Sequence, residues 1–272
     1  MTRYTLDDLI QVMACLRDPK DGCPWDIQQS YRDIVPFTLE EAYEVADAIE
    51  RGAYEELPGE LGDLLFQVVF YARLAEEDAR FDFAEIVHQL VDKLLTRHPH
   101  VFPDATLSSF GTATGVSMRD IKSRWEEKKA DERAARGQLG LFDDVPKALP
   151  ALSRAQKIQK RARAIGFDWV QIEGVLDKVS EELTELHEAR TQNDPKQVLA
   201  EFGDLLFTIV SLGRHLGVDS EQALRLATLK FQQRLNTVQH LALQQSLQVS
   251  EVDDAVRERL WQMAKEQLSE QS

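Results

Sequence analysis

Apolar residues recur at steps of three and four along most of the chain, the spacing that places them on one face of an α-helix. The stretch from residue 179 to 210 has two such runs, separated by the polar turn Asn193-Asp194-Pro195. Proline suits the first position of a helix, because its missing N–H would have no partner there. The pattern predicts a helix, a tight turn and an antiparallel helix, with apolar positions at Val179, Leu183 and Leu186, then Leu199, Phe202, Leu206 and Ile209.

Acidic residues share a face on each of these helices. On the first, Glu182 and Glu185 are three apart and Glu181 precedes them; on the second, Glu201 and Asp204 are three apart. Residues three or four apart are neighbours on a helix surface, so antiparallel packing would bring both acidic faces together. Repulsion among clustered carboxylates favours a bound cation, and oxygen ligands suit Mg²⁺ first and Mn²⁺ second. A single EExxE motif alone would be typical of a solvated face.

The same motifs occur earlier in the chain. EExxE at residues 40–44 is followed by ExxD-Leu-Leu-Phe at 60–66, and the pair recurs at 181–185 and 201–207. The two motifs begin 20 residues apart in both copies (60 − 40 and 201 − 181). Because an internal repeat defines the fold unit, we expect an all-α protein of two tandem, homologous helical modules. The first copy offers a second possible metal-binding set, Glu41, Glu44, Glu60 and Asp63.

Turn residues predict where the modules and helices end. Residues 137–152, which contain two glycines and two prolines, are expected to link an N-terminal module (residues 1–136) to a C-terminal module (residues 153–272). No run of residues alternates in the way a strand requires. Thr38 is expected to cap the helix that carries Glu41, and Pro58 to mark the turn before the next helix. Gly203 is expected to let two helices approach closely.

The composition narrows the possible partners. The chain has 272 residues and a formal net charge of −15, so we expect no direct binding to nucleic acid, which needs a basic footprint. No apolar run is long enough for a signal peptide or a membrane span. Cys15 and Cys23 provide neither a disulfide framework nor metal-ligand spacing. A cytoplasmic location is the expectation.

The duplicated motifs, with Arg97-His98-Pro99-His100-Val101-Phe102 between them, resemble the MazG family of bacterial nucleoside triphosphate pyrophosphohydrolases. The resemblance covers essentially the whole chain. It implies a Mg²⁺-dependent hydrolase that cleaves standard or non-standard nucleoside triphosphates to the monophosphate and pyrophosphate, in nucleotide-pool housekeeping. It also implies a homodimer and a catalytic C-terminal module.

Site residues follow from the same resemblance. Metal binding is carried over to Glu182, Glu185, Glu201 and Asp204, with Glu181 assisting the cluster or activating water. Nucleotide, including ATP, contacts are carried over to Lys129, Lys230, Arg234, Trp261 and Lys265.

Alternatives stay open at this stage. Lys230 and Arg234 lie one helical turn apart, which suits either one phosphate chain or two solvated charges. Trp261 can equally stack on a base or pack in the core. The acidic set of the N-terminal module is as complete as its counterpart, so the motifs do not explain why it would be idle. The alternative function is a non-catalytic nucleotide-sensing or interaction scaffold.

Overall fold

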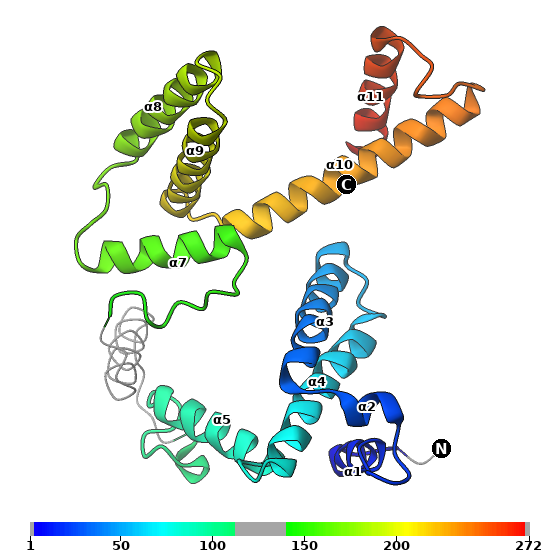
Figure 1. Cartoon of the computed structure of the whole chain (residues 1–272), viewed down its shortest axis with the longest axis vertical. Coiled ribbons are helices and arrows are strands. Elements are labelled where there is room, and N and C mark those ends of the chain that lie inside the picture. The colour runs from blue at the N-terminus through cyan, green and yellow to red at the C-terminus, as the bar shows by residue number, and fades with distance from the viewer. Residues whose placement is uncertain (1–2, 112–139, 270–272) are drawn as a thin grey trace. The chain divides into compact units, whose positions relative to one another are not determined.

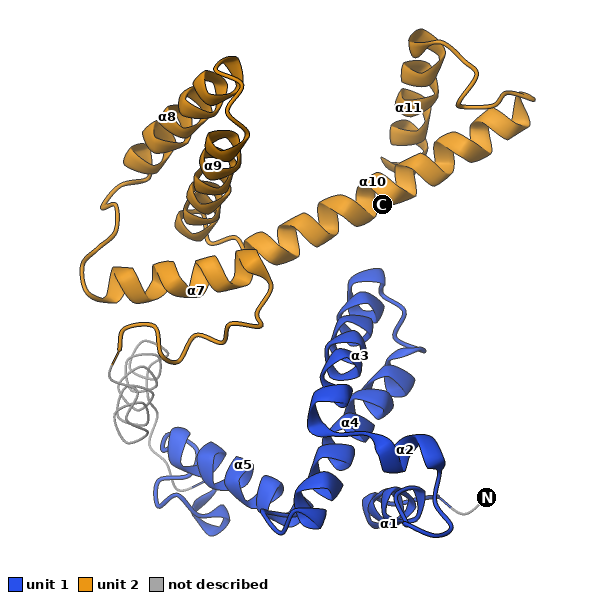
Figure 2. Ribbon diagram, in the orientation of Figure 1, with its two compact units in different colours: residues 1–132 blue, residues 133–272 orange. Residues whose placement is uncertain are grey.

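The computed structural model describes residues 3–111 and 140–269, and it divides the chain into two compact units, residues 1–132 and 133–272 (Figures 1 and 2). Within these described ranges the regular elements are α-helices and one 3₁₀ turn, with no strand, which confirms the expected all-α class. No described helix has the length and apolar content needed to cross a membrane. Lys129, one of the predicted nucleotide contacts, lies outside the described residues.

Unit 1 is built around an antiparallel helical hairpin. Its helices α3 and α4 pack on each other along their length, α1 packs against α4, and α5 follows. The core of the unit consists of Met13, Ile34, Val69, Phe70 and Leu74, all buried. The elements of this unit are α1 (Leu6–Leu16), α2 (Pro24–Gln28), α3 (Tyr31–Arg51), α4 (Leu57–Glu77), α5 (Phe83–Arg97) and the 3₁₀ turn η1 (Leu107–Ser109).

Two predicted helix limits in unit 1 are wrong. Helix α3 begins at Tyr31, after a capping box formed by Ser30 and Asp33, so Thr38 lies inside the helix. There its hydroxyl bonds the carbonyl oxygen of Ile34 at 3.1 Å, which satisfies the side chain without a cap. Pro58 lies in the first turn of α4, where proline is tolerated, and not in the turn before it.

Unit 2 repeats this hairpin and extends it. Helices α8 and α9 pack antiparallel, α7 packs on α9, and α10 continues to a separate contact with α11 (Figure 1). Pro195 opens α9 as predicted, and the Asp194 side chain accepts hydrogen bonds from the backbone N–H groups of Lys196 and Gln197. The helices are α7 (Ala151–Ala164), α8 (Ile172–Thr191), α9 (Pro195–His215), α10 (Ser220–Gln244) and α11 (Asp254–Ser269).

The two hairpins correspond position by position. An offset of 141 residues relates Glu41 to Glu182 and Asp63 to Asp204 (182 − 41 and 204 − 63), and it also relates the first residues of α3 and α8. Several matched pairs are buried in both copies, which indicates the same inward face. Two matched pairs differ in chemistry: Phe37 corresponds to Lys178, and Phe70 corresponds to Ser211.

Candidate metal centre and active site

Three of the predicted acidic residues of unit 2 lie together. Glu182 projects from the middle of α8, while Glu201 and Asp204 project from neighbouring turns of α9. One carboxylate oxygen from each lies within 4.8 Å of the others. The i, i+3 spacing on α9 and the antiparallel packing of α8 therefore produce the cluster that the sequence predicts.

Glu182 is the buried member of this cluster. Only 4% of the residue is exposed, and its Oε2 atom has no hydrogen-bond partner. A buried carboxylate oxygen without a partner is unfavourable unless a cation or a donor satisfies it. Glu201 is partly exposed and Asp204 is exposed, so the cluster is open to solvent on the α9 side. This arrangement fits a small divalent cation held by oxygen ligands, as Mg²⁺ or Mn²⁺ would be.

Lys178 contacts the cluster, and the sequence analysis did not identify it. Its Nζ atom lies 2.9 Å from Oε1 of Glu182 and 2.7 Å from Oε1 of Glu181. Hydrogen bonds to Glu181 and then Glu182 raise the pKa of Lys178, so the ammonium form is held there. The signal that could have found it is the comparison of the two copies, because the matched position in unit 1 is Phe37.

Glu185 lies beside the cluster without joining its closest group. Partial burial raises the pKa of Glu185; the Lys178 ammonium opposes that rise, while the carboxylates of Glu182 and Glu201 add to it. A carboxyl whose pKa is raised by burial and by neighbouring negative charge is stabilised in its ionised form by a cation placed nearby. Glu181 is mostly exposed at the edge of the cluster, paired with Lys178.

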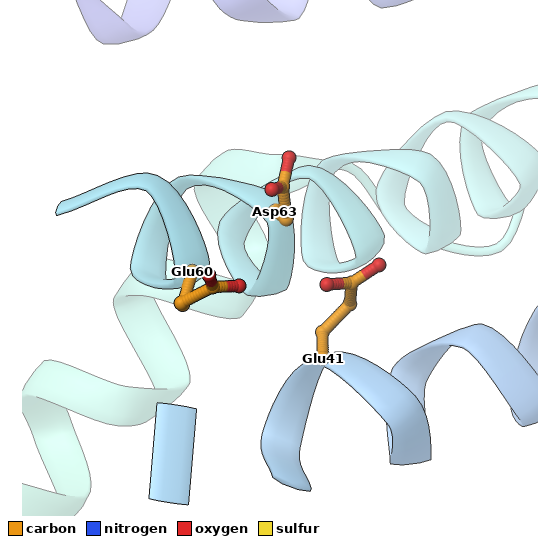
Figure 3. A group of neighbouring side chains, drawn as sticks. All are labelled: Glu41, Glu60 and Asp63. Carbon is orange, nitrogen blue, oxygen red and sulfur yellow. The ribbon is translucent and has the colours of Figure 1, made fainter. Parts of the chain in front are cut away.

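Unit 1 contains the matching cluster. Glu41 reaches from α3 toward Glu60 and Asp63 on α4 (Figure 3), and one oxygen from each lies within 4.8 Å of the others. Burial, and then the charge of the exposed Glu44, raises the pKa of both Glu41 and Glu60. No lysine occupies the place of Lys178, because that position is Phe37.

The predicted nucleotide contacts lie on other helices. The guanidinium carbon of Arg234 on α10 lies 5.8 Å from the ring centroid of Trp261 on α11, a cation–π geometry. Trp261 also contacts Phe231 and packs, partly buried, against the α10–α11 core. Lys230 is exposed one turn before Arg234, and Lys265 follows Trp261 by one turn.

These contacts are separated from the acidic cluster within unit 2. Asp204 lies 11 residues before the end of α9, about 16 Å along the helix axis, whereas α10 starts beyond that end. Helix α11 packs on the part of α10 far from the α8–α9 hairpin (Figure 1). Within unit 2 the structure therefore brings together Glu182, Glu201 and Asp204 and, at a separate place, Arg234 and Trp261.

The expected role of Gly203 is wrong. A Cβ atom at this position would meet nothing within 4 Å outside its own helix. The α8–α9 contact is made by other positions, so no close approach depends on this glycine.

Comparison with known proteins gives two family matches along the chain. The family model of the MazG nucleotide pyrophosphohydrolase domain matches residues 29–102, and that of phosphoribosyl-ATP pyrophosphohydrolase matches residues 155–228. A nucleoside triphosphate pyrophosphohydrolase of Escherichia coli is 47% identical over 264 residues, which cover 96% of this chain and 97% of the relative. The chain belongs to the MazG family. Both the predicted family and the predicted pair of tandem modules are confirmed.

Other MazG relatives span bacteria of different kinds. The nucleoside triphosphate pyrophosphohydrolase/pyrophosphatase MazG of Thermotoga maritima is 39% identical over 259 residues, 95% of each chain. A nucleoside triphosphate pyrophosphohydrolase of Mycolicibacterium smegmatis is 31% identical over 226 residues, 81% of this chain and 65% of the relative. The first two of these three relatives match along nearly their whole length, so the tandem arrangement of modules is shared with them.

Proposed function

We propose that the protein is a Mg²⁺-dependent hydrolase that converts nucleoside and deoxynucleoside triphosphates to the monophosphate and pyrophosphate. The observation that carries this proposal is the buried, unpartnered oxygen of Glu182 within 4.8 Å of carboxylate oxygens of Glu201 and Asp204. The names of the Escherichia coli and Thermotoga maritima relatives give the reaction class. Hydrolysis adds one water, breaks the bond between the α- and β-phosphates and releases pyrophosphate.

Different residues of unit 2 would bind the metal ion and activate the attacking water. Glu182, Glu201 and Asp204 would hold the ion, with Glu185 completing the set as the cluster is loaded. When bound, Mg²⁺ or Mn²⁺ neutralises phosphate oxygens and polarises the phosphorus under attack. Glu181, exposed at the edge of the cluster, would assist the cluster or accept the proton of the attacking water.

Lys178 supports assignment of the catalytic role to the C-terminal module. An ammonium at 2.9 Å from Glu182 is close enough to contact a phosphate bound at the cluster. Phe37 at the matched position in unit 1 cannot do so. We propose that the N-terminal set, Glu41, Glu44, Glu60 and Asp63, binds metal or nucleotide without turnover, which keeps the sensing function as the alternative for that module alone.

We also propose that the protein is a homodimer. Large apolar side chains are exposed along the hairpin and α10 of unit 2; Leu199 is 75% exposed and Phe231 is 56% exposed. Many large apolar side chains exposed on neighbouring helices support a protein–protein interface there. A second copy could then place Lys230, Arg234, Trp261 and Lys265 beside the acidic cluster, which they do not reach within one chain. Light scattering of the wild type and of Leu199→Glu tests this, and a wild-type monomer would contradict it.

The substrate proposal is tested by a panel of ribo- and deoxynucleoside triphosphates with the full-length chain, with and without Mg²⁺. We expect equal amounts of monophosphate and pyrophosphate, and none after chelation. Release of orthophosphate alone would indicate an ordinary phosphatase and overturn the proposal. Glu41→Gln is expected to keep pyrophosphate release, whereas its counterpart Glu182→Gln is expected to lose it; the opposite result would move catalysis to unit 1. A cytoplasmic location and the boundaries 1–136 and 153–272 remain proposals.

A further inference from the structure

A cavity of about 550 Å³ lies in unit 2 outside the acidic cluster. It opens to solvent on one side and is lined by α7, by the segment from Gly166 to Trp169 and by one face of α9. Its walls are mostly aromatic and apolar, with Phe142, Phe167, Trp169 and Phe207 among them. A volume of this size, lined this way, is typical of sites for small organic ligands.

The matched place in unit 1 is filled by a phenylalanine ring. Phe70 is fully buried there, with the edge of Phe66 at a centroid distance of 6.0 Å and the Arg17 guanidinium carbon 5.2 Å from its ring centroid. Unit 2 keeps the counterpart of Phe66, which is Phe207, but has Ser211 in place of Phe70. Ser211 is only 1% exposed and lines the cavity. The second copy therefore lacks an aromatic ring at a position where the first copy has one.

A guanidinium also lines the cavity, as one faces the ring in unit 1. The Arg214 Nη2 atom donates to Oγ of Ser211 at 3.2 Å, beside the point where a ring would begin. Arg214 is held by two hydrogen bonds to the carboxylate of Asp168, and both side chains are almost fully buried. These hydrogen bonds lower the pKa of Asp168, so the pair stays ionised and the carboxylate, which also lies 3.5 Å from His215 and 3.9 Å from Arg163, already compensates the charge of Arg214. An uncharged, planar ligand with hydrogen-bonding edges suits this lining better than a phosphate does.

Gln159 and Trp169 provide further groups that could orient a ligand in the cavity. Gln159 is buried and lines the cavity, and its Oε1 atom lacks a partner while its Nε2 donates to the carbonyl of Phe207. The Trp169 ring lies against the backbone of α8 at Gly174, where an added Cβ would come within 2.8 Å of it. The glycine at 174 thus leaves room for the indole of Trp169, which is 41% exposed and lines the cavity. An aromatic ring in this position can stack on a planar ligand.

We infer that this cavity binds the heterocyclic base of a nucleoside. The choice of a nucleobase among planar rings rests on the proposed function. Ser211 follows Asp204 by seven residues on α9, about 10 Å along the axis, a separation that one nucleotide can bridge. The base belongs either to the substrate held at the acidic cluster or to a second nucleotide that regulates the enzyme.

The test uses the full-length protein and nucleosides that carry no phosphate. Calorimetric titration with adenosine, guanosine, cytidine, uridine and thymidine, without metal, is expected to show saturable binding of at least one base. Ser211→Phe, which restores the ring of unit 1, is expected to weaken this binding by about tenfold or more, equivalent to about 1.4 kcal/mol. Ser211→Ala, which leaves the cavity open, is the matched control and is expected to bind within about threefold of wild type.

A second filled variant guards against misfolding. Ala162→Leu narrows the cavity from α7 and is expected to weaken nucleoside binding as Ser211→Phe does. Each variant is expected to keep a cooperative thermal melting transition, which shows that it is folded. Absence of nucleoside binding to the wild type overturns the inference, and so does binding to both filled variants that is as tight as binding to the wild type. Binding of indole as tight as that of the best nucleoside would also overturn it, because the cavity would then select only an apolar ring.

Kinetics separate the two sources of the base. If the substrate supplies it, Ser211→Phe raises KM for the triphosphates. If a second nucleotide supplies it, KM is unchanged and the effect of added nucleoside on the rate disappears. Pyrophosphate release without nucleoside binding would refute the proposal that the cavity binds a base and would leave the proposed function intact. Nucleoside binding without triphosphate hydrolysis would refute the function alone.

Discussion

Replacement of Glu182 by glutamine tests whether the acidic cluster of unit 2 is a metal site. The change removes one charge and one anionic ligand but keeps the shape of the side chain. The nearest oxygens of these carboxylates lie within 4.8 Å of one another, and two charges at that limiting distance repel by about 3.5 kcal/mol at an effective dielectric constant of about 20. Glu182 takes part in two such pairs, so about 7 kcal/mol of gross repulsion disappears, together with the attraction to Lys178. We therefore expect the metal-free variant to fold.

The expected effect is on the response to Mg²⁺. At a concentration about 100 times its dissociation constant, a ligand stabilises the folded state by about 2.7 kcal/mol. For a unit of about 140 residues this raises the melting temperature by about 5–10 °C. Loss of a buried ligand is expected to weaken binding by about 100-fold or more, since even supporting residues are worth 10–100-fold. At the same Mg²⁺ concentration the variant then gains only about 0.4 kcal/mol, or about 1 °C.

Calorimetry of the full-length chain in a chelator and in Mg²⁺ measures this shift. Glu188→Gln is the matched control, because Glu188 lies exposed on the same helix. It should keep the full shift. Pyrophosphate release by Glu182→Gln is expected to fall by about 1,000-fold, equivalent to about 4 kcal/mol of lost stabilisation of the transition state. An undiminished Mg²⁺ shift in Glu182→Gln would refute the metal site, and undiminished pyrophosphate release would refute its catalytic role.

Three further predictions concern neighbouring charges. Because the pKa of Glu185 is raised above its ordinary value of 4.5, its ionised form lowers folding stability as pH rises through the folded-state pKa; Glu185→Gln should melt higher than wild type at neutral pH in a chelator, and a gap that persists below pH 4.5 would contradict this. Lys178→Met leaves Glu182 without its cation, so the metal-free protein should melt at a lower temperature and Mg²⁺ should stabilise it more than it stabilises the wild type. The control Lys157→Met changes an exposed lysine and should show the same Mg²⁺-induced shift in melting temperature as the wild type. The same shift in Lys178→Met would contradict the role of Lys178. Arg214→Met removes the two short hydrogen bonds of the buried Asp168 carboxylate, which keeps only the longer contacts to His215 at 3.5 Å and Arg163 at 3.9 Å, so it should reduce stability by at most about 3–5 kcal/mol. The Arg214 pair lowers the pKa of Asp168, so its stabilisation is present above the unfolded pKa and is lost as pH falls through the folded value; thermal melts should therefore show the gap between wild type and Arg214→Met closing in acid, and a constant gap would contradict it.

The hairpin and its acidic face could be predicted because they depend on local spacing. The apolar steps place one face of α8 and α9 inward, and the i, i+3 spacing of Glu201 and Asp204 aligns their side chains whatever surrounds them. Pro195 opens α9 for a reason confined to its own residue. These features survive any tertiary arrangement that packs the two helices antiparallel.

Other features depend on contacts that local spacing does not contain. Thr38 looked like a cap, yet Ser30 and Asp33 provide one earlier and the helix continues through Pro36. The separation of Trp261 from the acidic cluster depends on the direction in which α10 leaves α9. The cavity beside Ser211 depends on a small residue facing α7, and only the comparison with Phe70 in the other copy makes that residue conspicuous.

The ion pair between Lys178 and Glu182 bears on the order of folding and metal binding. Because the Lys178 ammonium offsets part of the repulsion among the carboxylates, the packing of α8 on α9 does not require a bound metal ion. A metal ion that binds at this cluster would then displace the Lys178 ammonium from Glu182 in a hairpin that is already folded. The α8–α9 hairpin is therefore expected to stay folded without metal, whereas the cluster of unit 1 has Phe37 in place of that lysine and lacks this counter-ion.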